Sequence, residues 1–172
     1  MVLVSSRQFD EFLKITQQLN QINIIPLLMG AVGLEVVTEK NWYAKDIDIH
    51  VPGDKGGWEI PPEYQIHQWK EIIKIMETMG YKLVNLHEHE FTKEDLSVGF
   101  ASVDTLPDFA GVKLQDLKLK QRGKLKYFLL SPEQFLSVYR SSSKDSYRSD
   151  KNNNKDINKI KFLENMLGPF NC

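Results

Sequence analysis

The chain has 172 residues, of which 41% are hydrophobic and 26% are charged. This length allows one domain with a buried core, and the composition is that of an ordinary globular protein. The 22 Lys and Arg residues nearly balance the 23 Asp and Glu residues, and the net charge is -1. Charge in bulk therefore gives no argument for a nucleic-acid partner, and we expect none.

The sequence shows no sign of a disulfide-bonded or membrane protein. Cys172 is the only cysteine, so no disulfide can form within the chain and no set of thiolates can bind a metal. Residues 1–7 lack a basic region followed by an apolar run, and no stretch of eighteen uncharged apolar residues occurs. We expect a cytoplasmic protein without a membrane segment.

Hydrophobic spacing predicts helices and strands in the first half of the chain. An amphipathic helix is predicted over residues 7–21 after a serine cap, and an apolar strand over 24–29. Residues 31–38 fit either a short helix or more strand, because many of them are β-branched. After a strand that begins at Asp46 and a glycine-rich loop, a helix is predicted over 62–79.

The middle of the chain predicts antiparallel β structure. Partial alternation indicates strands over 81–91 and 96–103, which the four residues between them would join as a hairpin. A second hairpin is predicted from 112–120 and 124–130.

The last part of the chain predicts helices. Ser131 and Pro132 form a strong helix-start signal, whereas the Ser-rich segment 141–154 indicates a mobile loop or a frayed helix end before a final helix. We therefore expect a core domain over residues 1–130 and a helical segment over 131–172 that packs on the same domain.

A predicted strand over 46–51 gathers three polar side chains. Asp46, Asp48 and His50 share one face because side chains alternate along a strand, and the apolar residues between them face the core. The two carboxylates would lie about 7 Å apart, where each disfavours the ionisation of the other unless a cation or donors offset the charge. A divalent metal is the usual remedy, and His50 is expected to be a solvated or hydrogen-bonded neighbour.

The order Met29-Gly30-Ala31, a gap of fourteen residues, and Asp46-x-Asp48 resembles the signature of the polymerase-β-like nucleotidyltransferase superfamily. That signature is a hydrophobic residue, Gly, Gly or Ser, and Asp-x-Asp on the next strand. The resemblance covers residues 24–51, and Lys155-Asp156 resembles the Lys-Asp element of small antibiotic- and toxin-antitoxin-type members. It implies an α/β (α+β) fold in which helices flank a mixed sheet, with further helices at the C-terminus.

The resemblance also implies roles for individual residues. Asp46 and Asp48 would be catalytic acids and ligands of one or two magnesium ions. The backbone at Gly30 and Ala31 would hold the phosphates of ATP or another nucleoside triphosphate, and Lys45 would either assist or be a solvated lysine.

A third catalytic acid is expected on a later strand of the family fold. Asp104 is the predicted candidate, and Glu88 and Glu90 are alternatives that would share one strand face. The middle of the predicted strand over 96–103 contains no acid. In addition, Ala31 occupies the position where the family has Gly or Ser. A chain without a third carboxylate could bind nucleotide without transferring it.

Three functions follow from these patterns. The first is a metal-dependent nucleotidyltransferase that acts on a hydroxyl of a small molecule or protein. The second is a catalytically inactive relative that binds or regulates a partner, for example in a toxin-antitoxin pair. The third is an α+β domain without a functional site. A zinc site at His87 and His89 is a weaker alternative, because the sequence shows no third ligand for the metal. The acceptor, the base and the oligomeric state are not determined by the sequence.

Overall fold

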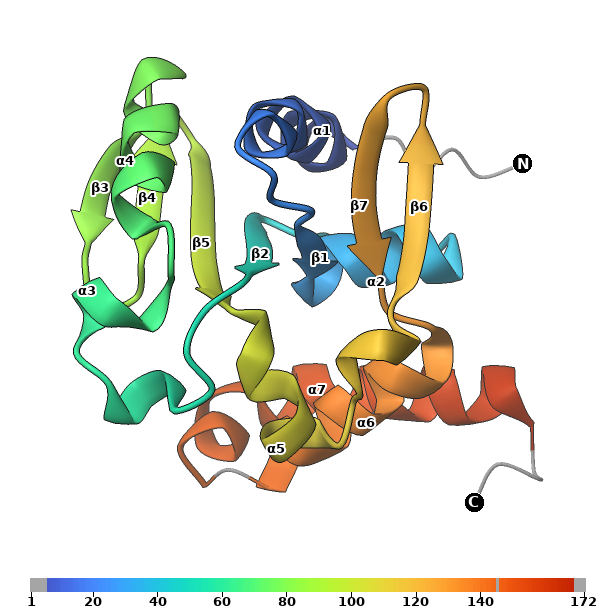
Figure 1. The fold of residues 1–172 in the computed structure, drawn as a ribbon. Helices are drawn as coiled ribbons and strands as arrows, with labels where there is room; N and C mark the ends of the chain where they lie inside the picture. The colour runs from blue at the N-terminus through green and yellow to red at the C-terminus, as the bar shows by residue number, and fades with distance from the viewer. Residues whose placement is uncertain (1–5, 145, 169–172) are drawn as a thin grey trace.

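The computed structural model describes residues 6–144 and 146–168, and for 146–155 it describes the backbone only. The described strands form one seven-stranded sheet in the order β3-β4-β5-β2-β1-β7-β6 (Figure 1). Their bounds are β1 Leu27–Met29, β2 Asp46–Val51, β3 Lys82–Asn85, β4 Glu90–Lys93, β5 Leu96–Ser102, β6 Lys118–Arg122 and β7 Leu125–Leu129. The β2–β5 and β1–β7 pairs are parallel and the other pairs are antiparallel, which confirms the predicted mixed sheet.

Helices cover both faces of the sheet. They are α1 Arg7–Gln21, α2 Gly30–Thr38, α3 Pro62–Gln65, α4 Trp69–Thr78, α5 Leu106–Ala110, α6 Pro132–Lys144 and α7 Ser146–Leu167. In the described part of the chain, no helix has the length and apolar character needed to cross a lipid bilayer.

The first face of the sheet carries the larger core. The amphipathic helix α1 buries Phe12, Ile15 and Leu19 completely, as its spacing predicts, and α4 packs beside it. Alternate side chains of β2 and β5 point into this core, including Ile49 and Val98, neither of which is exposed. The alternation leaves the intervening side chains of both strands on the second face.

The second face is covered unevenly. Leu27 and Met29 of β1 pack with α6 and α7 residues such as Phe135 and Leu163 in a second apolar cluster, and Figure 1 shows α5, α6 and α7 gathered together. Leu27 is paired with His50 of β2, so this cluster and the acidic residues of β2 lie on the same side of the sheet. The helices therefore cover the β1 part of this face, and the face continues over β2 and β5 as small and polar side chains.

The predicted helix over 62–79 is wrong in its middle. The structure has α3 and α4 instead, because residues 65–67 form backbone hydrogen bonds with the loop after β2. Asp54 N–H donates to Gln65 O at 2.8 Å, and His67 N–H donates to Pro52 O at 3.2 Å. These bonds hold Ile66 in an extended bridge with Gly53, which a continuous helix cannot provide.

The predicted strand over 81–91 is two strands joined by a turn. β3 and β4 pair antiparallel, and His89, which has a φ of 50°, precedes β4. His89 N–H donates to Leu86 O at 3.1 Å, and Glu88 N–H donates to the side chain of Asn85 at 3.1 Å. Glu88 therefore lies in a turn, and the expectation that it shares a strand face with Glu90 is wrong.

Two further expectations about the chain are resolved by the fold. Residues 30–38 are helical (α2) rather than strand, since the chain must turn back between β1 and its neighbour β2. Of the two alternatives for 141–154, a loop or a frayed helix end, the loop is wrong: α6 extends to Lys144 and α7 begins at Ser146. The side chains of 145–155, with Lys155 among them, and Cys172 lie outside the described residues.

Candidate functional site

The register of the sheet aligns the candidate acids in rows across neighbouring strands. Asp48 is paired with Met29 on one side and with Gly99 on the other, and Gly99 is in turn paired with Glu90 of β4. Paired residues point to the same side of a sheet, so Asp48 and Glu90 lie on one face with a glycine between them. Asp46 lies on the same face in the next row, beside Ser97.

Gly30 brings the backbone turn between β1 and α2 against Asp48. Its φ is 63°, a conformation that side chains other than glycine rarely adopt, and a Cβ at this position would collide with the Asp48 carboxylate. Only glycine allows both the turn and the approach of the carboxylate. The acid pair of β2 and the glycine turn, which lie far apart in the sequence pattern, therefore meet in space.

Gly99 opens the other side of the same carboxylate. A Cβ here would lie 3.7 Å from Asp48 Oδ1 and 4.0 Å from the carbonyl oxygen of Glu88, both ordinary contact distances. The Asp48 carboxylate thus lies between two glycines on neighbouring elements. The sequence analysis missed Gly99, although a glycine within a strand is a known sign of close approach by a neighbour.

His50 lies on the acidic face and is partly buried. Its Nδ1 atom is buried and has no hydrogen-bond partner among the described residues. Burial lowers the pKa of His50 to about 4, because the charged imidazolium loses its hydration. The ring is therefore neutral at pH 7 and adds no positive charge beside the acids.

The other predicted acids lie near this face but are held by partners. Asp104 follows β5 in a short helical turn, and its Oδ2 atom accepts a hydrogen bond from Gly53 N–H at 3.0 Å. Glu90 accepts a hydrogen bond from Ser97 Oγ at 2.8 Å. Among the residues that the structure describes, no three His, Cys, Asp or Glu side chains form a group that could hold a metal by themselves. Asp104 is thus not brought into a three-acid group with Asp46 and Asp48.

The remaining candidates surround the acid pair. Ala31 follows Gly30 in the first turn of α2, and Lys45 is exposed directly before β2. The loop between α2 and β2 is anchored by buried Glu35, which accepts hydrogen bonds from Trp42 N–H and Ala44 N–H at 2.9 and 3.2 Å. This anchor fixes the approach of the chain to Asp46.

Asp156 of α7, which belongs to the Lys155-Asp156 element singled out in the sequence, is buried. Its side chain is 2% exposed, and its Oδ2 atom has no hydrogen-bond partner among the described residues. Lys155 lies outside the described side chains.

Comparison with known proteins shows to which family the chain belongs. No protein-family model matches it. Over 160 residues it is 37% identical to the uncharacterised protein YnaI of Bacillus subtilis (strain 168), a match that spans 92% of this chain and 97% of YnaI. The chain belongs to the YnaI family.

Two solved structures share the fold of this YnaI-family protein. An antigenic nucleotidyltransferase-like protein from Paracoccidioides brasiliensis matches 92% of this chain and 76% of its own, with a TM-score of 0.61 and 15% identity. The antibiotic-resistance factor ANT(2'')-Ia matches 94% of this chain and 84% of its own, with a TM-score of 0.57 and 14% identity. These likenesses confirm the nucleotidyltransferase-like fold that the sequence motif predicted.

The histidine pair suggested as a zinc site is divided between two environments in the YnaI-family structure. The exposed His87 ring lies 4.9 Å from the ring of Trp58. His89 is buried against Trp69, and its Nε2 atom lies 2.8 Å from the carbonyl oxygen of Pro62. Burial lowers the pKa of His89. The two rings do not share a strand face, so the zinc expectation is not supported by their placement.

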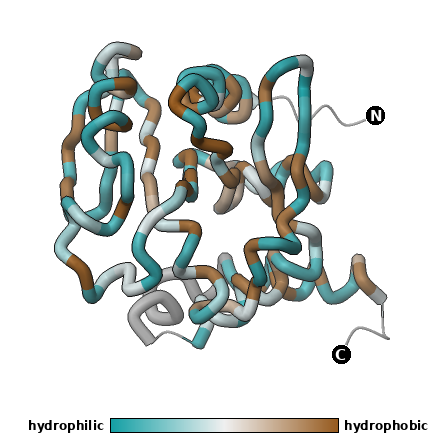
Figure 2. Tube along the Cα trace, viewed as in Figure 1, coloured by the Kyte–Doolittle hydropathy of each residue, from teal (hydrophilic) through white to brown (hydrophobic). Residues whose placement is uncertain are grey.

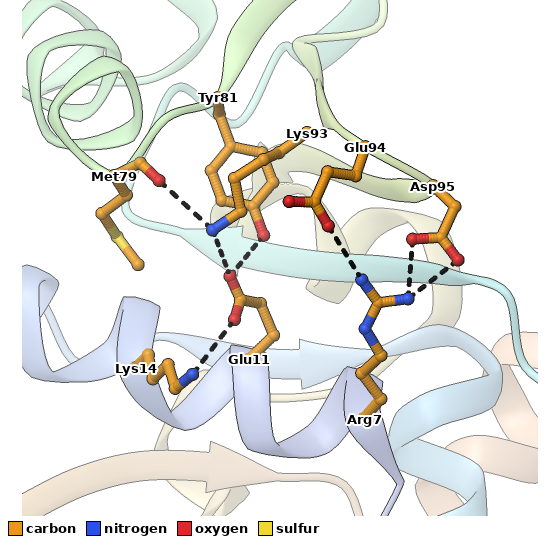
Figure 3. Close-up of polar contacts among 8 residues, drawn as sticks. All are labelled: Arg7, Glu11, Lys14, Met79, Tyr81, Lys93, Glu94 and Asp95. Carbon is orange, nitrogen blue, oxygen red and sulfur yellow. Dashed lines mark hydrogen bonds and ion pairs between the residues drawn. The ribbon is translucent and has the colours of Figure 1, made fainter.

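A second polar cluster lies on the opposite face of the sheet (Figure 3). Glu11 of α1 is buried, accepts a hydrogen bond from Tyr81 Oη at 2.7 Å and accepts another from Lys93 Nζ at 3.2 Å. Lys93 also donates to Met79 O at 3.2 Å, and Lys14 Nζ lies 3.8 Å from Glu11 Oε1. We refer to Glu11, Tyr81 and Lys93 as the α1 cluster.

The titration of the α1 cluster reflects these contacts. Burial by itself would raise the pKa of Glu11, but the hydrogen bonds from Tyr81 and Lys93 and the charges of Lys93 and Lys14 outweigh it, so the pKa is lowered. Burial raises the pKa of Tyr81, and its hydrogen bond to Glu11 adds to this effect. The cluster is therefore a satisfied polar contact that joins α1 to β4 and to the start of β3.

Proposed function

We propose that this YnaI-family protein binds a nucleoside triphosphate with Mg²⁺ at the Asp46–Asp48 face and transfers a nucleotidyl group to a hydroxyl of a small molecule or protein. The observation that carries the proposal is the contact between the Asp48 carboxylate and the Gly30 turn. This contact supports the proposal because carboxylate oxygens, which Mg²⁺ prefers, lie next to the backbone that would bind the phosphates. The nucleotidyltransferase-like fold supports the same assignment.

Asp46 and Asp48 fit a magnesium site by the chemistry of their donors. Mg²⁺ is commonly held by one or two carboxylates together with the phosphates of a nucleotide, so a third protein acid is not needed for binding. When bound, the ion would neutralise charge on the phosphates and position the reacting groups. Asp48 would bind from its place between Gly30 and Gly99, and Asp46 would bind from the next row of the same strand.

The first turn of α2 is the proposed binding site for the phosphates. Its N–H groups lack partners within the helix, and they carry the positive end of the helix dipole, which favours an anion. Gly30 and Ala31 supply this backbone, and the absence of a side chain at Gly30 lets the Asp48 carboxylate lie directly against it. Lys45, exposed before β2, would add a positive charge toward the end of the phosphate chain.

The proposal keeps Asp104 as the predicted third catalytic acid, with Glu90 as the alternative. Asp104 would act from the end of β5, where it now holds Gly53 N–H, and Glu90 would act across Gly99 from β4. Asp104→Asn and Glu90→Gln separate these roles. The variant that abolishes transfer while nucleotide binding stays intact identifies the acid that activates the acceptor hydroxyl.

Calorimetry with ATP, GTP, CTP and UTP, with and without Mg²⁺, tests the site itself. We expect Mg²⁺-dependent binding by the wild type and a loss of at least tenfold in affinity for Asp46→Asn/Asp48→Asn. The control is Asp10→Asn/Asp108→Asn, which removes two charges from exposed positions of α1 and α5. Binding that does not depend on Mg²⁺, or equal losses in both double variants, would overturn the proposal.

A catalytically inactive relative is the second candidate, because one specific observation favours it. The described residues hold no group of three metal-binding side chains, and β5 carries Gly99 in the row of Asp48. Such a protein would bind nucleotide and release no pyrophosphate. Measurement of pyrophosphate release across a panel of small-molecule and protein acceptors separates the two candidates.

A further inference from the structure

Residues 113–126 are strongly basic, although the net charge of the whole chain is small. Residues 113–126 contain six Lys or Arg side chains and a single acid, Asp116, while the whole chain has a net charge of -1. All six basic residues are exposed: Lys113, Lys118, Lys120, Arg122, Lys124 and Lys126. We refer to residues 113–126 as the basic hairpin, because β6 and most of its pairing with β7 lie within them.

The basic hairpin lies at one end of the sheet. β6 is the last strand in the sheet order and pairs only with β7, and each of its five residues is exposed. Figure 1 shows the turn of the hairpin standing clear of the C-terminal helices, and Figure 2 shows that this turn is hydrophilic. The basic side chains are therefore accessible along the strand, around the turn and on the second strand.

The register separates this charge from the acidic face. Lys118, Lys120 and Arg122 are paired with Leu129, Tyr127 and Leu125, and buried Tyr127 and Leu129 belong to the core on the α1 side. The Arg122 guanidinium lies 5.8 Å from the ring of Phe9 of α1. These three cations therefore point to the side of the sheet opposite Asp46 and Asp48, about 7 Å apart along the strand.

The six charges lack acidic partners in the described part of the chain. None of them forms an ion pair with another residue that the structure describes. Lysines on an edge strand can protect it from unwanted pairing, which would account for Lys118 and Lys120. That explanation does not extend to Lys113, Lys124 and Lys126, which lie outside the edge strand.

We propose that the basic hairpin binds the phosphate backbone of single-stranded nucleic acid without sequence preference. Its cations are distributed over both sides, the turn and the preceding segment, so they suit a flexible chain of charges that wraps around the hairpin. An acidic peptide added to the edge of β6 would meet only the cations on one side. Five of the six are lysines, which act as point charges, and residues 113–126 contain no aromatic ring to stack on bases.

The charge repeat favours a single strand over a duplex. Phosphates of a duplex rise about 3.4 Å per step along each strand at fixed positions, whereas a single strand can extend until its phosphates match the spacing of about 7 Å between alternate residues of β6. The inference does not rest on the proposed nucleotidyltransferase function, because it concerns the other side of the sheet.

Fluorescence anisotropy with a labelled 20-nucleotide single-stranded RNA of mixed sequence tests the proposal over a salt titration. We expect binding by the full-length wild type that weakens with salt, and a weaker, less salt-dependent interaction for Lys118→Gln/Lys120→Gln/Arg122→Gln. Loss of three phosphate contacts should reduce the slope of log affinity against log salt by about 2. All three side chains are exposed, so unchanged circular dichroism and melting temperature are expected and should be measured.

The matched control is Lys70→Gln/Lys74→Gln/Lys82→Gln, which removes three exposed charges from α4 and β3 at the other end of the sheet. It should bind RNA as the wild type does, as should Asp46→Asn/Asp48→Asn. A DNA of the same sequence should bind within a few-fold, because only phosphates are contacted. Absence of binding, equal losses in both triple variants, tighter binding to a duplex, or displacement of RNA by polyglutamate of equal charge would each overturn the proposal.

Discussion

The two faces of the sheet use buried or half-buried carboxylates in different ways. On the α1 side, Glu11 is enclosed and accepts hydrogen bonds from Tyr81 and Lys93, with their side chains filling the space around it. On the other side, Asp48 is flanked by Gly30 and Gly99, where side chains are missing. Glu11 is thus enclosed by side chains, whereas the Asp48 carboxylate occupies the place that a side chain at Gly30 would take.

A structural acid and a candidate ligand-binding acid differ in their surroundings. A buried carboxylate that only stabilises the fold is surrounded by donors, because an unsatisfied charge is costly to bury. A carboxylate that binds a cation together with a phosphate needs neighbouring positions without side chains, such as glycines. The comparison predicts that changes in the α1 cluster affect stability alone, whereas changes at the two glycines affect binding.

The largest expected effect is on stability, from Glu11→Ala. The change leaves the Tyr81 hydroxyl without its acceptor and removes the negative charge beside the Lys93 ammonium, so we expect a loss of about 2–4 kcal/mol in the free energy of unfolding. Urea unfolding measures it. Asp10→Ala, at an exposed position of the same helix, should change stability by less than about 0.5 kcal/mol. A loss below about 1 kcal/mol for Glu11→Ala would show that the α1 cluster is not structural.

Gly30→Ala should affect both stability and nucleotide binding. The added Cβ must adopt an unfavourable φ and also meet the Asp48 carboxylate, and we expect a loss of about 1–3 kcal/mol. Gly111→Ala is the control, since Gly111 has a φ of 68° but nothing lies within 4 Å of its Cβ position. The two variants share the backbone strain, so any excess cost at Gly30 measures the collision with Asp48. Equal stability losses with intact Mg²⁺-nucleotide binding would argue against the role of the Gly30 turn.

Gly99→Asp should strengthen metal binding at a smaller cost to the fold. The new Cβ fits at ordinary contact distances and places a third carboxylate in the row of Asp48. Without Mg²⁺ we expect a loss of about 1 kcal/mol from like-charge repulsion, and with Mg²⁺ a recovery of the melting temperature. Gly99→Asn has nearly the same shape without the charge and should show no Mg²⁺-dependent recovery. Melting temperatures that do not change with Mg²⁺ in either variant would contradict a metal site at Asp48.

The smallest effect concerns the acid dependence of stability. Because the pKa of Glu11 is lowered in the folded state, unfolded chains bind more protons near the ordinary value of 4.5. The stabilisation from ionised Glu11 is therefore complete above that value and is lost as the pH falls through the lowered pKa. Glu11→Gln should be less stable than the wild type at pH 7 and should lose less stability between pH 5 and pH 3. Parallel pH profiles for the two proteins, obtained by urea unfolding, would contradict this assignment.

Some elements could be predicted from the sequence because their signals are local. The helix over 7–21 has a serine cap and a continuous apolar stripe, and both are present in α1. Asp46–Val51 shows strict alternation, so its two faces followed directly from the pattern.

Other elements were mispredicted because distant residues decide them. The turn before β4 contains neither Gly nor Pro, and the capping Asn85 gave too weak a signal to divide the predicted strand. The break between α3 and α4 depends on hydrogen bonds to the loop after β2. The segment from 141 has a loop-like composition, yet α6 and α7 extend into it, and these two helices pack through apolar residues that lie before and after it.

The charge of the protein shows the same division. The net charge of -1 offered no argument for a nucleic-acid partner, but a net charge does not show where the charges lie. Only the sheet order shows that the basic hairpin forms an exposed edge on the side opposite the acids.

By itself, the sequence determined the type of most elements, the shared face of Asp46 and Asp48 and the likeness to nucleotidyltransferases, because these depend on spacing along a strand or helix. The tertiary structure decided that Gly30 and Gly99 flank the same carboxylate and that Asp104 instead binds Gly53. The physical reason is that strand pairing joins residues far apart in the chain. The residue that packs against a glycine can be identified only from the folded structure.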